Sequence, residues 1–415
     1  MHSDPAQAVF VWVWLPGATE PVVAGVLTTE GGITSFTYGA SYRSRPDAVS
    51  LYLPELPLRA GEIPPLAGLR VAGCIDDGSP DAWGRRVIEH RHAPPRAKEL
   101  DAVSYLLESG SDRIGALDFQ ASPDRYVPRS GGGSLDELID AAEHLEAGEP
   151  FFAELDEALF QGSSIGGARP KAILADGKRQ LIAKFSSSTD HYPVVNAEGV
   201  AMALARRVGL DAASTEVVSS LGREVLLVER FDRTDVPGER TMMVSALTML
   251  GLDEMMGRYA TYPDLADIIR ERFADAPEAL REMFGRIAFN VCVGNTDDHA
   301  RNHAAFWDGE TLALTPAYDI CPQMPSGGEV VQAMAIGRDL GNPTNPLMRL
   351  SRLSTCVAAA SEYLLSEGEA REIIDHHLHV INAEWEDAAA EARLTRAEAD
   401  QLWGRQILNP SIFDT

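Results

Sequence analysis

The stretch FNVCVGNTDDHARNHAAFW, residues 289–307, contains the residue types best suited to chemistry. Asp297 and Asn302 lie five positions apart, a spacing found in enzymes that transfer phosphate from ATP. There a carboxylate can accept the proton of an attacking hydroxyl, and a nearby amide oxygen can hold Mg²⁺ against the phosphates. Asp319 follows seventeen positions after Asn302, in LTPAYDICP. Its carboxylate suits a second contact to Mg²⁺, because this hard ion prefers oxygen ligands.

Two other interpretations of this stretch remain open from the residues alone. Asp and Asn are common in polar loops at helix ends, where their side chains bond the local backbone. His299 and His303 lie four positions apart and could bind zinc from one helical face. The glutamate of the H-E-x-x-H motif is missing, however, since Ala300 and Arg301 fill the positions after His299.

A second group of residues lies earlier, in QGSSIGGARPKAILADGKRQLIAKF, residues 161–185. Gly166 and Gly167 have no Cβ, so their backbone N–H groups can approach phosphate oxygens. Lys184 follows in LIAKF, where strand alternation places it on one face with Ile182. A Gly-rich loop followed by a strand lysine is the phosphate-binding layout of protein kinases. The alternative is a plain turn with a surface lysine.

The same stretch contains G-x-S-x-G at residues 162–166, which matches the nucleophile elbow of esterases. That motif requires a strand before the serine and a helix after it. We expect the reverse order here, with a helix over 151–160 and a strand over 171–175. Ser164 is therefore not expected to be a nucleophile.

Composition argues against several classes of protein. The 415 residues can form two or three cores, and no run of about 18 apolar residues is present that could cross a membrane. The net charge of −26 would repel phosphate backbones, so the chain should not bind nucleic acid alone. The four cysteines lie far apart without a C-x-x-C pair. This argues against a disulfide framework or a cysteine zinc site and fits the cytoplasm.

Residues 1–120 are expected to form short strands followed by helices. The expected strands lie in VFVWVWL, VVAGVLTTEGGITSFTYG and AVSLYLPEL, and the expected helices in SPDAWGRRVIEHRH and LDAVSYLLES. The Pro- and Gly-rich run 122–134 is typical of a boundary. Ser134 and Glu137 are then spaced as a capping box at the start of the next helix.

Around the Gly-rich stretch, strands are expected over 171–175 and 180–185, joined by a tight turn at Asp176-Gly177. A helix over 196–209 and a strand over 223–230 follow. From about residue 240 onwards the pattern is helical. This order predicts an α+β, two-lobed kinase-like fold with a β-rich N-terminal lobe and an all-helical C-terminal lobe.

Taken in this order, the stretches resemble the HipA family of bacterial toxin serine/threonine kinases. The likeness is carried by SSIGGARPKA, LIAKF, NAEGVAMALARRVGL, LLVERFDR, NVCVGNTDDHARNHAAF and LTPAYDICP, and earlier by VAGVLTTEGGITSFTYGASY, SLYLPELPL, DGSPDAWGRRVI and SGSDRIGALDF. It covers most of the chain. The resemblance implies a HipA-type N-terminal subdomain over 1–120, a kinase N-lobe over 134–235 and a helical C-lobe over 236–415.

The resemblance also implies a role for each matching residue. Asp297 would be the catalytic base, Asn302 and Asp319 would hold Mg²⁺, and Lys184 would contact the nucleotide phosphates. Glu198 could pair with Lys184, as a helix glutamate does in ordinary kinases. The full set implied to bind the nucleotide is Gly166, Gly167, Ala168, Arg169, Pro170, Lys171, Lys184, Glu229, Arg230, Phe231, His299, Ala300, Arg301, Asn302, Tyr318 and Asp319.

Within that set, residues 166–171 would cover ATP and residues 229–231 would form the hinge at the adenine. Ser164 matches the serine that such kinases autophosphorylate, and Ser163 is a second candidate. Added phosphate charge would repel the nucleotide phosphates and push the loop out of the site. Some members carry Gln-Glu where this chain has Arg169-Pro170, and Pro170 removes one N–H donor from the loop.

The resemblance thus implies a cytoplasmic serine/threonine protein kinase that depends on Mg²⁺ and ATP and acts as the toxin of a toxin–antitoxin pair. Its protein substrates would include aminoacyl-tRNA synthetases, and its antitoxin would be a HipB-like helix-turn-helix protein. Because the chain is acidic, it would reach DNA only through that partner, and no membrane is involved. The alternative is a kinase-shaped, non-catalytic co-repressor bound to the antitoxin.

Overall fold

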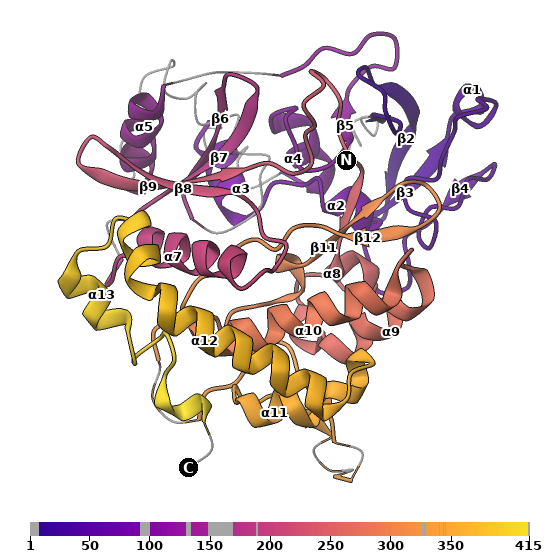
Figure 1. Cartoon of the computed structure of the whole chain (residues 1–415). Helices are drawn as coiled ribbons and strands as arrows, with labels where there is room; N and C mark the ends of the chain where they lie inside the picture. Colours follow the sequence, from indigo (N-terminus) through magenta and orange to yellow (C-terminus); the bar gives the residue numbers. More distant parts are fainter. Residues whose placement is uncertain are drawn as a thin grey trace.

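The computed structural model describes residues 8–413, apart from 92–99, 130–133, 148–168, 188–189 and the single positions 326, 328, 340, 343 and 345. Figure 1 shows two halves, with most of the strands in one and the long helices in the other. The two-lobed α+β architecture predicted from the sequence is confirmed.

The N-terminal half begins with a five-stranded antiparallel sheet in the order β4-β3-β2-β1-β5. Its strands are β1 (Val9–Val13), β2 (Val22–Glu30), β3 (Ile33–Tyr38), β4 (Glu62–Ile63) and β5 (Leu117–Gln120). The strand predicted in AVSLYLPEL is wrong, because this stretch forms turns with a single bridge between Tyr52 and Leu56. Pro54 has no N–H for a ladder, and the N–H of Leu56 turns back to bond the carbonyl of Tyr52.

A second antiparallel sheet has the order β6-β7-β9-β8. Its strands are β6 (Lys171–Asp176), β7 (Arg179–Phe185), β8 (Thr215–Ser220) and β9 (Arg223–Glu229). Asp176 pairs with Arg179, so the tight turn lies at Gly177-Lys178, one residue later than predicted. Gly177 has φ +61°, a backbone conformation that glycine adopts without strain.

The helices described before β6 are α1 (Ala40–Arg43), α2 (Gly73–Asp76), α3 (Ala82–Arg91), α4 (Ala102–Glu108) and α5 (Leu135–Ala147). Helices α3 and α5 cover one face of the second sheet, where Trp83 and Leu138 join a cluster with Ala183 and Phe185. The predicted capping box at the start of α5 is confirmed. The N–H of Ser134 donates to the Glu137 carboxylate at 2.7 Å, and the N–H of Glu137 donates to the Ser134 hydroxyl at 3.3 Å.

The opposite face of the second sheet packs against α7 (Val194–Arg207). This helix corresponds to the one predicted over 196–209, and it begins and ends two residues earlier. Its other side lies along α12 of the helical half (Figure 1). Helix α7 therefore joins the sheet to the helices below it, and residues on α7 are placed between the two halves.

The C-terminal half contains six helices among the described residues: α8 (Ala246–Met249), α9 (Tyr262–Arg272), α10 (Ala276–Val293), α11 (Leu353–Ala358), α12 (Glu367–Glu391) and α13 (Arg396–Leu402). The expectation that this half is all-helical needs a correction. It also contains β10 (Met243–Ser245), β11 (Ala304–Trp307) and β12 (Leu312–Leu314), which form one small sheet, and the pair β13 (Gly337–Arg338) and β14 (Leu347–Met348). These strands are two to four residues long, too short to show a clear alternation in the sequence.

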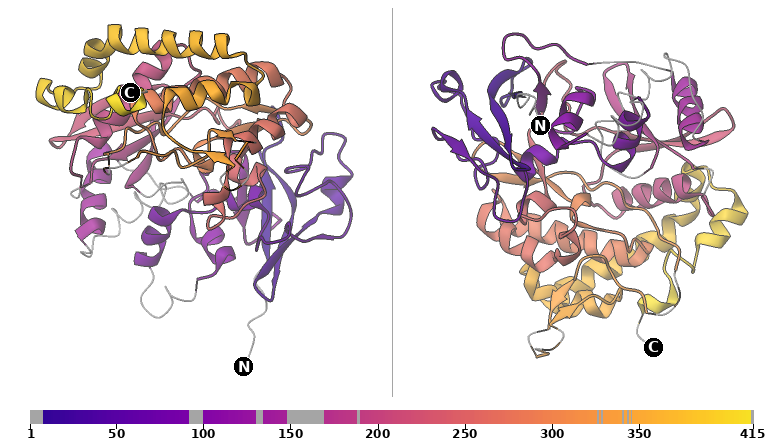
Figure 2. Two further views of the ribbon diagram at one scale, coloured as in Figure 1. Left: turned by 90° about the horizontal axis from the view of Figure 1, so that it is seen from below. Right: turned by 180° about the vertical axis from the view of Figure 1, so that it is seen from behind.

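One hydrophobic core extends through most of the described chain, from Val9 in β1 to Ile412 near the C-terminus. Helix α10 lies at its centre and contacts α9, α11 and α12. Figure 2 shows α12 on the outside of the helical half, away from the N-terminal sheet. Within the part of the chain that the structure describes, no helix is long and apolar enough to cross a lipid bilayer.

Candidate active site

Lys184 of β7 lies between two carboxylates that come from different elements. Strand alternation turns Ala183 and Phe185 toward the covered face of the sheet and leaves Lys184 on the opposite face. The Lys184 ammonium contacts Oε1 of Glu198, in α7, at 2.5 Å, and it also pairs with Oδ1 of Asp319. The contact between Lys184 and Glu198 that the sequence suggested is therefore present.

The charges of these three residues depend on one another. The Glu198 side chain is only 6% exposed, and burial raises the pKa of its carboxyl while Lys184 opposes that rise. Burial also opposes ionisation of Asp319, but the Lys184 ammonium outweighs it and lowers the pKa of Asp319 to about 2. Burial alone would lower the pKa of Lys184, yet the two carboxylates raise it. Lys184 and Asp319 are consequently an ion pair at neutral pH.

The predicted catalytic loop begins where α10 ends. Gly294, with φ +69°, terminates the helix, and a Cβ at this position would come within 2.7 Å of the carbonyl oxygen of Gln406. Asp297 lies three residues further on with an exposed side chain. The buried Asn302 donates its Nδ2–H to the carbonyl of Asp297 at 3.3 Å, which joins the two ends of the loop.

The carboxyl of Asp297 is more basic than an ordinary aspartate. Partial burial raises its pKa, and the negative charges of Asp319 and Asp298 raise it further, while His299 opposes them. A raised pKa increases the ability of a carboxylate to accept a proton. The same interactions show that Asp297 lies within electrostatic reach of Asp319.

Asp298, which we did not single out in the sequence, anchors this loop to the protein interior through hydrogen bonds. Its side chain is buried and its Oδ2 accepts hydrogen bonds from Nδ2 of Asn290 at 2.7 Å, from the hydroxyl of Tyr262 and from Nε2 of His303 at 2.8 Å. The donors come from α9, from α10 and from the residue just before β11. The Asp297-Asp298 doublet was the only signal in the sequence, and it does not reveal which carboxylate faces inward.

Asp319 and its neighbour Tyr318 form the other wall of the site. Asp319 has φ +59°, an uncommon left-handed conformation that aspartate tolerates better than most residues. The Tyr318 hydroxyl donates to the carbonyl of Arg301 at 2.7 Å, so this wall is bonded directly to the catalytic loop. The ring of Phe231 lies 5.6 Å from that of Tyr318, centroid to centroid, which places the end of the expected hinge beside the residue that precedes Asp319.

The residues expected to form the hinge, 229–231, differ in which of their groups could face a nucleotide. Glu229 ends β9, and the N–H groups of Glu229 and Arg230 donate to neighbouring carbonyls at 2.9 Å. The Arg230 side chain is buried in ion pairs with Asp112 at 2.9 Å and Asp232 at 2.8 Å. Its guanidinium is therefore directed to the N-terminal segment, and Arg230 can approach a nucleotide only through its main chain.

The loop that would cover the nucleotide is described only from Arg169 onwards. Ser163, Ser164, Gly166, Gly167 and Ala168, with the helix predicted over 151–160, lie outside the described residues. Arg169 pairs with Asp190 at 2.8 Å, and the carbonyl of Pro170 accepts from the N–H of Phe185. Lys171 begins β6 directly opposite Lys184 and is buried.

The residues of the zinc alternative do not come together as a metal site. His303 is buried and its Nε2 contacts Asp298, whereas His299 is exposed. Within the described ranges, no three His, Cys, Asp or Glu side chains are grouped as a metal site would require. The oxygens of Asn302 and Asp319, by contrast, suit Mg²⁺ bound jointly with a nucleotide.

Two observations support this fit to Mg²⁺. The Asn302 amide nitrogen is bonded to the Asp297 carbonyl, so the amide oxygen is the group left for a cation. The Asp319 side chain remains 42% exposed, and its charge repels that of Asp297. A divalent cation would relieve this repulsion. Ala300 and Arg301 lie in the short 3₁₀ turn Ala300–Asn302, which places Asn302.

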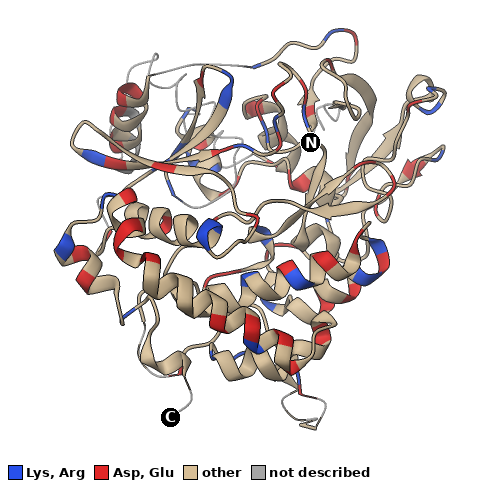
Figure 3. Cartoon of the chain, in the orientation of Figure 1, with Lys and Arg blue, Asp and Glu red and all other residues tan. Residues whose placement is uncertain are grey.

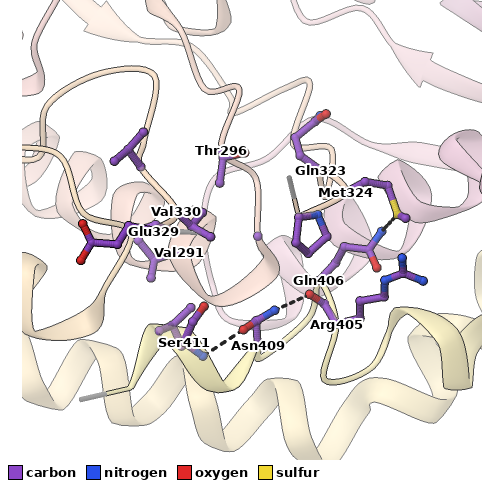
Figure 4. Close-up of a pocket in the computed structure, with 15 residues that line it drawn as sticks. Val291, Thr296, Gln323, Met324, Glu329, Val330, Arg405, Gln406, Asn409 and Ser411 are labelled. Atoms are coloured by element: carbon purple, nitrogen blue, oxygen red, sulfur yellow. Dashed lines mark hydrogen bonds between the residues drawn. The ribbon is translucent and has the colours of Figure 1, made fainter. Parts of the chain in front are cut away.

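A pocket of about 120 Å³ lies behind the catalytic loop (Figure 4). Its walls include Thr296, Gln323 and Gln406, and Gln406 donates to the sulfur of Met324 at 3.2 Å. None of the residues implied to bind the nucleotide lines this pocket. It therefore backs the loop and is separate from the site around Lys184.

The chain belongs to the HipA family. The HipA-like C-terminal domain matches residues 163–385, which is more than half of the chain, and the HipA N-terminal domain matches residues 13–120. The first of these matches contains Lys184, Glu198, Asp297 and Asp319.

Curated relatives carry kinase names. A putative kinase, Y4mE, from Sinorhizobium fredii is 29% identical over 181 residues, which cover 38% of this chain and 41% of the relative. The serine/threonine-protein kinase toxin HipA of Shewanella oneidensis is 27% identical over 184 residues, which cover 38% of this chain and 42% of the relative. The chain thus spans about two fifths of the length of these relatives.

A solved structure extends the likeness to nearly the whole fold. It is the complex of HipA, HipB and operator DNA from Shewanella oneidensis MR-1, and the match covers 94% of this chain and 95% of that chain with a TM-score of 0.65. Sequence identity over this match is 18%. The shared fold includes both halves of the molecule.

Proposed function

We propose that this protein is a serine/threonine protein kinase that uses Mg²⁺ and ATP and acts as the toxin of a toxin–antitoxin pair. One observation carries the proposal: Lys184 pairs with both Glu198 and Asp319, beside the loop that bears Asp297 and Asn302. Membership of the HipA family and the kinase names of curated relatives support it.

In this proposal Asp297 is the general base. Its exposed carboxylate, made more basic by its surroundings, accepts the proton of a substrate hydroxyl as that oxygen attacks the terminal phosphate. Lys184, oriented by Glu198, neutralises phosphate oxygens of the nucleotide. Asn302 and Asp319 hold Mg²⁺, which when bound supplies positive charge against the phosphates. The main chain of residues 229–231 lies at the adenine.

We further propose that Ser164 is the autophosphorylation site, with Ser163 as a second acceptor. A phosphate on Ser164 would add negative charge to the loop proposed to cover ATP and would repel the nucleotide phosphates. Arg169 and Lys171, at the end of this loop, are fixed by contacts with Asp190 and Asp81. Phosphorylation should therefore leave the start of β6 in place.

The proposed substrate is a protein such as an aminoacyl-tRNA synthetase, and the proposed partner is a HipB-like helix-turn-helix antitoxin. The solved structure that shares this fold is a complex of HipA with HipB and operator DNA, which supports the second assignment. With a net charge of −26, the kinase would reach DNA through the antitoxin and would act in the cytoplasm.

The decisive experiment compares phosphate transfer by the wild type and by Asp297→Asn. We expect the substitution to reduce transfer from labelled ATP by 10²–10⁴-fold or more while Mg²⁺–ATP binding, measured by titration, persists, because the exposed Asp297 is not part of the core. Asp308→Asn is the matched control, since Asp308 is an exposed carboxylate in the β11–β12 turn.

Each outcome has a clear meaning. Undiminished transfer by Asp297→Asn would show that the base is misassigned. A wild type that binds nucleotide without transferring phosphate to itself or to proteins of a cell extract would favour the non-catalytic co-repressor. Mass spectrometry of phosphoserines on the labelled chain and on extract proteins would locate the acceptor and identify the substrate.

A further inference from the structure

Two lysines lie directly opposite each other on the face of the second sheet that contains the site. Lys171 of β6 pairs with Lys184 of β7, and directly opposed residues of an antiparallel pair project to the same side. Like charges placed opposite each other destabilise a sheet. Here the Lys171 side chain is only 3% exposed, so solvent screens its charge poorly. The repulsion between the two ammonium groups must be offset by nearby negative charge, and a polyanionic ligand would also offset it.

Asp81, at the start of α3 in the N-terminal segment, approaches Lys171. Its Oδ2 lies 3.5 Å from the Lys171 ammonium, while its Oδ1 accepts from the N–H of Gly84 at 2.9 Å. The second bond caps α3 and fixes the carboxylate in place. Burial lowers the pKa of Lys171, and the charge of Lys184 lowers it further, whereas the charges of Asp81 and Asp319 oppose that change. Asp81 therefore favours the charged form of the lysine.

The segment that carries Asp81 is anchored to both halves of the molecule. The half-buried carboxylate of Asp77 accepts from the N–H of Ser245 at 2.8 Å, the Ser245 hydroxyl at 2.7 Å and the Thr248 hydroxyl at 2.9 Å, at the start of α8. The carbonyl of Gly78 accepts from Arg113 at 2.6 Å. These bonds fix the chain just before Asp81, so the position of its carboxylate is set by the fold.

We propose that Asp81 is a positioning residue for the nucleotide: it holds the Lys171 ammonium, charged and oriented, beside Lys184. The N-terminal segment thereby contributes one residue, Asp81, to the proposed phosphate site, whose other residues come from the kinase-like part of the chain. The inference rests on the proposed function, because it assumes that the site around Lys184 binds a nucleoside triphosphate. Asp81 touches neither nucleotide nor reacting atoms in this assignment and acts through Lys171.

Asp81→Asn is the variant that separates charge from capping. Asparagine caps a helix as well as aspartate does, so α3 is preserved while the negative charge beside Lys171 is removed. Asp101→Asn is the matched control, because Asp101 caps α4 by accepting from Ser104 at 2.8 Å and lies at an exposed position. If Asp81→Asn does not fold, Asp81→Ser replaces it, since serine also caps a helix without charge.

We expect Asp81→Asn to weaken Mg²⁺–ATP binding about tenfold in a titration, and to raise KM for ATP more than it lowers kcat, whereas Asp101→Asn leaves both unchanged. Lys171→Met should weaken binding by a similar factor. Adding Asp81→Asn to Lys171→Met should then have no further effect, because the first residue acts through the second. A merely structural role would lower the melting temperature without this dependence on Lys171.

The opposite result would overturn the inference. If Asp81 acted mainly by repelling phosphate, its neutralisation would tighten binding, and if it were only a cap, binding would not change. Additive losses in the double variant would also contradict a role through Lys171. A wild type that does not bind Mg²⁺–ATP would overturn the proposed function itself, and this result is distinct from normal binding by both wild type and Asp81→Asn.

Discussion

At the scale of single residues, the largely buried Lys184 ammonium balances the negative charges of two carboxylates. Glu198 comes from α7 and Asp319 from the segment after β12, so the ion pairs connect elements that are distant in the sequence. Removing one member of a buried ion pair leaves its partner uncompensated, which costs more than the pair itself contributes. Lys184 is therefore important for stability as well as for the proposed chemistry.

Lys184→Met should lower the free energy of unfolding by about 3 kcal/mol, because Glu198 is left buried without the ammonium that it pairs with. Denaturant unfolding followed by circular dichroism measures this loss. Lys178→Met, in the exposed turn before β7, is the control and should change stability by less than about 0.5 kcal/mol. The double variant Lys184→Met/Glu198→Gln should recover part of the loss. Equal stability of Lys184→Met and the control would contradict this account.

Adjacent residues of the catalytic loop illustrate a limit of sequence reasoning. Asp297 and Asp298 have the same side chain, and in an irregular loop no periodicity assigns one of them to the interior. The structure places Asp298 among three donors and leaves Asp297 exposed. The choice of Asp297 from its spacing to Asn302 is consistent with this placement, whereas the role of Asp298 could not be predicted.

At the scale of elements, a cluster of buried charges connects the hinge to the N-terminal segment. Arg230 and Arg233 follow β9, and both pair with Asp112 and Asp232. Burial opposes ionisation of these two carboxyls, but the arginines outweigh it and lower both pKa values below the ordinary value. The path of the chain between β9 and β10 is therefore fixed by charge as well as by packing.

Arg230→Met should lower the free energy of unfolding by about 3 kcal/mol at pH 7, since the buried Asp232 loses one of its two arginine partners and keeps Arg233. Lowered pKa values contribute stability above the ordinary carboxyl pKa, and this contribution is lost as pH falls through the folded-state pKa. The difference between wild type and variant should consequently shrink below about pH 4.

Urea unfolding at several pH values measures this trend. Arg223→Met is the control, because the Arg223–Glu143 pair is partly exposed and should contribute less than about 1 kcal/mol. A difference between wild type and Arg230→Met that is independent of pH would show that Arg230 stabilises the protein through packing rather than through charge.

At the scale of the whole molecule, the N-terminal sheet and the helical half share one core. Trp307 of β11 donates its indole N–H to the carbonyl of Ser50 at 2.9 Å, and its ring packs against Tyr52. Acidic residues are spread along α5 and α12 (Figure 3), which agrees with the net charge of −26. The first 120 residues are therefore packed against the rest and not merely attached by a linker.

This shared core predicts that the two halves unfold together. Trp307→Phe removes the indole donor and leaves the buried Ser50 carbonyl unpaired, so it should lower stability by about 1–3 kcal/mol. The loss should shift a single thermal transition seen by both tryptophan fluorescence and far-ultraviolet circular dichroism. Two separate transitions, of which only one moves, would show that the N-terminal segment folds independently.

The sequence by itself predicted the class of fold and the family, which are confirmed, and it singled out Lys184, Asp297, Asn302 and Asp319, whose roles stay predictions. It could do so because phosphate chemistry restricts both residue type and spacing, and because long helices and paired strands have clear periodicities. The short strands of the helical half, the inward-facing Asp298 and the approach of Asp81 to Lys171 were decided only by tertiary structure. These features depend on contacts between distant segments, and no local pattern in the sequence records which segments meet.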